Sequence, residues 1–74
     1  MNKDEIEVLV VESLSKFLKR SFDPEELKEP YDRLGADSMD MVVLAFELEK
    51  AIGKKISPEF FMQHDSIQDA LDAL

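Results

Sequence analysis

The sequence predicts an all-α protein of four helices, with a long loop after the first helix and a very short third helix. Three observations support this fold class. All glycines and prolines fall between residues 24 and 58, so the segments on either side are uninterrupted. Apolar residues recur at helical spacing, and no stretch alternates apolar and polar residues as a strand does. The 74 residues suffice for one domain, residues 1–74.

The first helix is expected from Asp4 to about Arg20. Its acidic residues gather in the first turn and its basic residues in the last, an order that suits the helix dipole. Apolar residues three, four and seven positions apart form one stripe, which we expect to face the core. The stripe consists of Ile6, Leu9, Val10, Leu14 and Phe17.

Residues 21–36 read as a long loop, because they contain two prolines, a glycine and no sustained period. One helical turn is expected within it, at Asp23 to Leu27. Three apolar side chains, those of Leu27, Tyr31 and Leu34, are expected to anchor the loop to the core. A loop of this length inside a small domain usually has a function, or else contains an element that the sequence pattern does not reveal.

The second helix is expected from Ser38 to about Ile52, and Gly53 can take the left-handed conformation that ends it. At 100° per residue this helix has two apolar faces. Because the core of a small domain covers only one, the other packs on a neighbouring short helix or stays available to partners. The expected inner face holds Met41, Leu44, Ala45, Leu48, Ala51 and Ile52, and the outer face Met39, Val42, Val43 and Phe46, with Asp40 and Glu47 between them.

Two shorter helices complete the prediction. Pro58 can occupy the first turn of a third helix that continues through about Gln63. Its apolar residues Phe60, Phe61 and Met62 are expected in the core. Ser66 is expected to cap the final helix, whose apolar side carries Ile67, Ala70, Leu71 and Leu74.

Charge and composition exclude several classes of function. Seventeen acidic and nine basic residues give a formal charge of -8, which disfavours nucleic acid and anionic membranes and favours basic protein surfaces as partners. The charge also fits a simpler role, keeping a small domain soluble. With no cysteine and one histidine, neither disulfides nor a metal site of thiolates or several histidines is expected. No segment resembles a signal peptide or a membrane span, so we expect a cytoplasmic protein, with an organelle matrix as the alternative location.

The stretch "RLGADSMDMVV" places Ser38 between two aspartates at the start of the second helix. In the simplest interpretation, Asp37 or Ser38 caps the helix and Asp40 completes a capping box. Ser66 with Asp69 fits the same description. A serine hydrolase is disfavoured, because the only histidine is His64 and no Gly-x-Ser-x-Gly motif surrounds Ser38, so no catalytic residue is assigned.

A third interpretation makes Ser38 the site of a modification by another enzyme. A serine in the first turn of a helix, reached through Gly35 and Ala36, directs its hydroxyl to solvent beside unpaired backbone N–H groups. A phosphodiester at this position would lie at the positive end of the helix dipole.

The motif "LGADSMD" and the helix after it resemble the acyl carrier proteins, whose signature is Leu-Gly-Ala-Asp-Ser-Leu-Asp, and the resemblance covers essentially the whole chain. It implies a four-helix bundle with a long first loop. It also implies that a phosphopantetheinyl transferase moves 4'-phosphopantetheine from coenzyme A to Ser38, beside Asp37. The thiol of this arm would carry acyl groups as thioesters among acyl-loading, condensing and acyl-transferring enzymes, and the chain itself would need no cysteine.

In that family the second helix is the main docking surface for partner enzymes. The resemblance therefore implies that acidic residues of this helix steer encounter with basic patches, while its outer face supplies apolar contact. Val43 stands where an acid is usual, and Lys50 and Ala51 interrupt a run that is often glutamate, so we predict a specialised carrier with a more apolar docking face. The predicted docking residues are Met39, Asp40, Val42, Val43, Phe46, Glu47 and Glu49.

Several questions stay open at this level. Fatty acid, polyketide and related specialised pathways all fit a monomeric, non-catalytic carrier. The alternative is an interaction module that keeps the carrier fold and docks on partners without using a prosthetic arm. A small enzyme is the least supported class.

Overall fold

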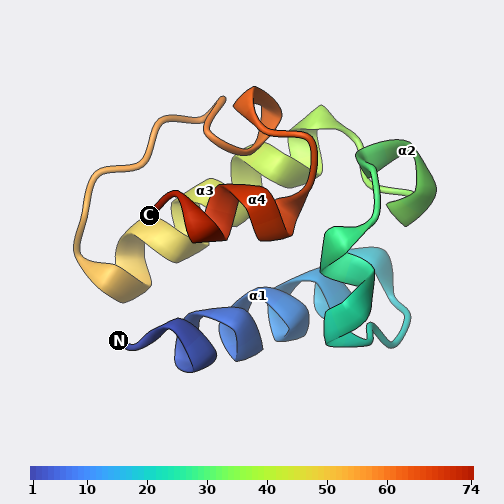
Figure 1. Ribbon diagram of the computed structural model, residues 1–74, viewed down its shortest axis with the longest axis horizontal. Helices are drawn as coiled ribbons and strands as arrows, with labels where there is room; N and C mark the ends of the chain where they lie inside the picture. Colours follow the sequence, from blue (N-terminus) through green and yellow to red (C-terminus); the bar gives the residue numbers. More distant parts are fainter.

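The computed structural model describes all residues, 1–74, and contains helices and no strands, which confirms the all-α fold class (Figure 1). Helix α1 contacts both α3 and α4, and the short helix η1 contacts α1 and α4. No helix combines the length and apolar character that a membrane span requires. The elements are α1 Lys3–Leu18, the 3-10 helix η1 Pro24–Lys28, α2 Tyr31–Leu34, α3 Ser38–Ile52, the 3-10 helix η2 Phe61–Gln63 and α4 Ile67–Asp72.

Helix α1 begins and ends with local signals. The Asn2 side chain accepts a hydrogen bond from the Glu5 amide at 2.8 Å, and the Glu5 carboxylate accepts one from the Asn2 amide at 3.1 Å. The helix ends at Leu18, before the expected Arg20, because Lys19 turns into the left-handed conformation with φ 54°. Lysine rarely adopts that conformation, so the sequence held no signal for this end.

The core is formed by side chains of α1, α3 and α4 together with residues of the segments that connect them. Full burial of a leucine or phenylalanine contributes about 1.5–3 kcal/mol, so these side chains dominate the stability of the fold. The expected inner face of α3 is correct except for Ala51, which is exposed because it lies at the edge of the stripe, in the last turn. The core residues are Val10, Leu14, Phe22, Leu27, Leu34, Met41, Leu44, Ala45, Leu48, Ile56, Phe61, Ile67, Ala70 and Leu71.

The loop between α1 and α3 is more regular than the sequence indicated. The expected turn is confirmed as η1, with Asp23 as its cap and Pro24 at its start. The prediction missed α2, because four residues are too few for a periodic pattern. Its signals were the flanking residues, since a proline often precedes a helix and Gly35, with φ 76°, follows as a left-handed end.

The loop is anchored to the last third of the chain. Leu27 and Leu34 are buried as expected, and Tyr31 is half-buried. The Tyr31 hydroxyl donates a hydrogen bond to the Phe61 carbonyl oxygen. An isolated antiparallel bridge pairs Pro30 with Ser66. These contacts hold the middle of the loop against the segment that leads into α4.

Three expectations for the end of the chain differ from the structure. The third helix is shorter than predicted: Pro58 lies in a turn, and only Phe61–Gln63 are helical, as η2. Met62 is 48% exposed rather than buried, because consecutive residues of a 3-10 helix point in directions about 120° apart and cannot all face the core. Leu74 is 37% exposed, since α4 ends at Asp72.

Candidate functional site

At the start of α3, Asp37 caps the helix and Ser38 does not. The Asp37 carboxylate accepts a hydrogen bond from the Asp40 amide at 3.0 Å, and the Asp40 carboxylate accepts one from the Asp37 amide at 3.1 Å. This reciprocal pair is a capping box. Ser38 is therefore the first residue of the helix, its side chain is exposed, and its hydroxyl is available to an external enzyme.

Ser66 has the opposite arrangement. It is only 5% exposed, and its hydroxyl oxygen accepts a hydrogen bond from the Asp69 amide at 3.1 Å. It is the cap of α4, as the sequence predicted. Because its oxygen is buried and already bonded, Ser66 is not accessible to a modifying enzyme.

Helix α2 and one arginine fix the approach to Ser38. Leu34, the last residue of α2, is buried, and Gly35 then turns the chain with φ 76°. A side chain at Gly35 would meet nothing within 4 Å, so the backbone conformation, and not a lack of space, favours glycine. The Arg20 guanidinium donates to the Leu34 carbonyl oxygen at 3.2 Å and pairs with Glu26 at 2.9 Å.

Arg20 therefore links the end of α1, η1 and the end of α2. Its guanidinium also lies 3.7 Å from the centre of the Phe22 ring. From the sequence, Arg20 is expected only in the last turn of the first helix. No local pattern identifies its role, because the bond to Leu34 spans fourteen residues.

The chemistry around Ser38 suits acceptance of a phosphodiester. The serine lies at the N-terminal end of a fifteen-residue helix, where unpaired N–H groups and the helix dipole favour an anion. No hydrogen bond joins Ser38 to a basic side chain that would activate it. The only histidine, His64, packs edge-on against Phe60, with ring centres 5.4 Å apart.

The predicted apolar docking residues on α3 are mostly on the surface. Met39 is 67% exposed, Phe46 54% and Val43 41%. Val42 is half-buried. Met62 of η2, an element packed against α3, adds exposed apolar surface that the sequence analysis assigned to the core.

The predicted docking acids also have roles within the fold. The Glu49 carboxylate accepts a hydrogen bond from the Ile56 amide at 2.8 Å and so fixes the chain after α3. Glu47 forms an exposed ion pair with Lys50 at 4.0 Å. Asp40 belongs to the capping box. All three acidic residues lie on the same helix as the apolar outer face, and each has an intramolecular contact.

An exposed serine at a helix start, with an exposed apolar helix face beside it, fits what the resemblance to the carrier proteins implies for Ser38. Residues 8–74 match the protein family described as the phosphopantetheine attachment site. The chain belongs to this family, and its domain is an attachment site for the 4'-phosphopantetheine prosthetic group. Neither the curated proteins nor the solved structures that were searched give a match.

Proposed function

We propose that the protein carries acyl intermediates as thioesters on a 4'-phosphopantetheine arm joined to the Ser38 hydroxyl. One observation carries the assignment to this residue: Asp37 takes the cap, so Ser38 stays exposed at the start of α3. The Ser38 oxygen would form a bond to the β-phosphorus of coenzyme A as the pyrophosphate bond breaks. The serine proton passes to the transferase, and 3',5'-adenosine bisphosphate leaves.

The residues around Ser38 would present the arm and take no part in its chemistry. Asp37 and Asp40 hold the first turn of α3 in place, and Arg20 holds the end of α2. The arm supplies the thiol that bears the acyl group. Because the chain has no cysteine, an acyl group on the arm has no competing thiol to which it can transfer.

The outer face of α3, defined by Met39, Val42, Val43 and Phe46, is proposed to dock the transferase and the acyl-loading, condensing and acyl-transferring enzymes. Its exposed apolar side chains support contact with an apolar patch on the partner. The negative charge of Asp40, Glu47 and Glu49 supports steering of basic patches toward the face.

The pathway that we propose is fatty acid, polyketide or related specialised biosynthesis in the cytoplasm. The one continuous core cluster, to which α1, the loop, α3 and α4 all contribute, supports residues 1–74 as a single carrier domain. We propose that this domain acts as a monomer. A specialised carrier is favoured because the outer face of α3 is apolar at Val43.

Intact mass spectrometry after incubation with coenzyme A and a permissive phosphopantetheinyl transferase tests the attachment residue. The wild-type chain and Ser66→Ala are expected to gain one phosphopantetheine, and Ser38→Ala none. The two variants are a matched pair, since each removes one hydroxyl from an Asp-Ser sequence. If the wild-type chain stays unmodified, the interaction module without an arm becomes the better description.

A further inference from the structure

Helix α1 also has an apolar side chain on its outer surface. Val8 is 55% exposed, whereas Val10, two residues later, is fully buried in the core. Two residues rotate a helix by roughly 200°, so the two side chains lie on opposite sides of α1. Because α1 packs against α3 on its buried side, Val8 faces away from the helix that begins with Ser38.

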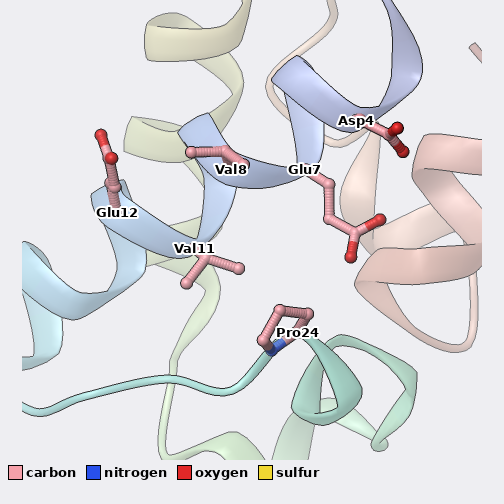
Figure 2. A pocket seen from close by; sticks show the side chains of 6 residues that line it. All are labelled: Asp4, Glu7, Val8, Val11, Glu12 and Pro24. Carbon is pink, nitrogen blue, oxygen red and sulfur yellow. The ribbon is translucent and has the colours of Figure 1, made fainter.

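Val8 borders a hollow between α1 and η1, which we call the α1–η1 groove (Figure 2). Its volume is about 440 Å³. Figure 2 shows Val11 and Glu7 pointing from α1 toward Pro24 at the start of η1. A smaller hollow continues along α1 to Met1, which is 57% exposed. The residues lining the groove are Asp4, Glu7, Val8, Val11, Glu12 and Pro24.

The rim of the groove is purely acidic. It contains three carboxylates, those of Asp4, Glu7 and Glu12, and no basic side chain. None of the three takes part in an ion pair of the structure, since the nearby Lys3 pairs with Asp72 at 2.6 Å. Asp4 complements the helix dipole in the first turn, but Glu12 lies too far along α1 for that explanation.

We propose that the α1–η1 groove binds a segment of a partner protein that presents one apolar side chain flanked by lysine or arginine. The apolar floor formed by Val8, Val11 and Pro24 would receive the apolar side chain. The three carboxylates, none of which forms an ion pair within the chain, would receive the basic groups. The same charge pattern disfavours an anionic membrane or an acidic partner.

The position of the groove gives this contact a distinct use. It is formed by α1 and η1, and the outer face of α3 contributes nothing to it. A partner seated in the groove therefore leaves Ser38 and the outer face of α3 free. Such a partner would hold the carrier while other enzymes act in turn on the arm, which is a tethering function beyond acyl transport itself.

Nuclear magnetic resonance titration with a synthetic helical peptide tests the proposal. The peptide carries one leucine, with lysines one turn before and one turn after it. Amide shifts are expected around Val8, Glu12 and Pro24, and not along α3. Two control peptides, one with alanine for the leucine and one with glutamates for the lysines, are expected to bind at least about tenfold more weakly.

Matched variants of the chain separate this groove from the outer face of α3. Val8→Ser is expected to weaken peptide binding about tenfold and to leave modification at Ser38 unchanged. Val43→Ser, an exposed helical valine on α3, is expected to leave peptide binding unchanged. Glu12→Lys is expected to weaken binding by more than tenfold, and Asp32→Lys, an equal change of charge on α2, by less than about threefold. Thermal unfolding of each variant checks that it is folded.

Three results would overturn the proposal. The first is peptide shifts that map to Met39, Val43 and Phe46. The second is equal binding of the alanine peptide, which would indicate attraction by net charge alone. The third is an equal loss of binding in Glu12→Lys and Asp32→Lys. None of them bears on the attachment site, because the modification of Ser38 is measured separately by mass.

Discussion

The starts of α3 and α4 share an Asp-Ser dipeptide but use it in different registers. At α3 the aspartate is the cap, and Ser38 becomes the exposed first residue of the helix. At α4 the serine is the cap, and Ser66 is buried with its oxygen bonded. A shift of one residue therefore decides whether the hydroxyl supports the fold or is available to another enzyme.

In both helices an acidic residue stands three positions after the residue that serves as the cap. Asp40 stands three residues after Asp37, and Asp69 three residues after Ser66. A cap at Ser38 would place Met41 in that position, where a capping box requires a side-chain acceptor and Met41 is instead buried in the core. Burial of the apolar face of α3 and its capping thus favour the same register.

Removal of each serine hydroxyl should affect stability and modification in opposite ways, and this is the largest contrast that we expect. Ser66→Ala should lower the free energy of unfolding by about 0.5–2 kcal/mol, because the Asp69 amide loses its cap. Ser38→Ala should change it by less than about 0.5 kcal/mol. Urea denaturation measures both, and Ser66→Thr, which keeps a capping oxygen, is the control. Equal losses would contradict the assignment of the caps.

Removal of the Asp37 side chain should change which residue caps α3. Asp37→Ala is expected to lower the free energy of unfolding by about 1 kcal/mol, because the Asp40 amide loses its acceptor. It should also slow phosphopantetheine transfer to Ser38, whose hydroxyl then becomes the nearest substitute cap. Denaturation and a time course of intact mass measure the two effects. Asp37→Ser keeps a cap, so a transfer rate equally slow in that variant would speak against this coupling.

Loss of the hydrogen bond that anchors the loop should lower the free energy of unfolding least among the losses expected for Ser66, Asp37 and Tyr31. Tyr31→Phe removes the donor to the Phe61 carbonyl oxygen, with an expected cost of about 1 kcal/mol or less. Ser38 should still be modified, because the bond involves neither Ser38 nor the residues that cap α3. Urea denaturation measures the loss of stability, and intact mass shows whether Ser38 is still modified.

The same tyrosine gives the stability a dependence on pH. Burial, followed by the charges of Asp69 and Asp65, raises the pKa of Tyr31 from 10.0 to about 12. Since the folded pKa exceeds the unfolded one, this contribution is fully present below about pH 10 and is lost as the pH rises toward about 12. The wild-type protein should therefore lose more stability than Tyr31→Phe over that range. Denaturation on both sides of about pH 10 measures the difference, and parallel losses would contradict it.

The sequence was most informative where local signals define an element. Helix α3 has the predicted bounds, Ser38–Ile52, because an acidic cap precedes it and Gly53 follows. The predicted turn in the loop became η1 for a similar reason, since a proline follows its aspartate cap. In both cases the residues that set the boundary lie within a few positions of it.

The sequence was less informative where contacts between distant residues decide the outcome. It left Asp37 and Ser38 as equal candidates for the cap, because both fit the local pattern. The contact of Arg20 with α2 and the acidic rim of the α1–η1 groove depend on how η1 folds back onto α1. Met62 was misassigned because its residue type favours the core, while the 3-10 geometry turns it outward.

The contacts between the loop and the segment before α4 affect the order in which the chain can fold during synthesis. Tyr31 is bonded to a residue thirty positions later, and Pro30 pairs with Ser66. Such distant contacts form late, because the ribosome must first produce the second partner. Helices α1 and α3 can pack once Ile52 has emerged. A nascent chain that ends before Phe61 therefore already contains Ser38, the proposed attachment residue, but neither of these two contacts of the loop has formed.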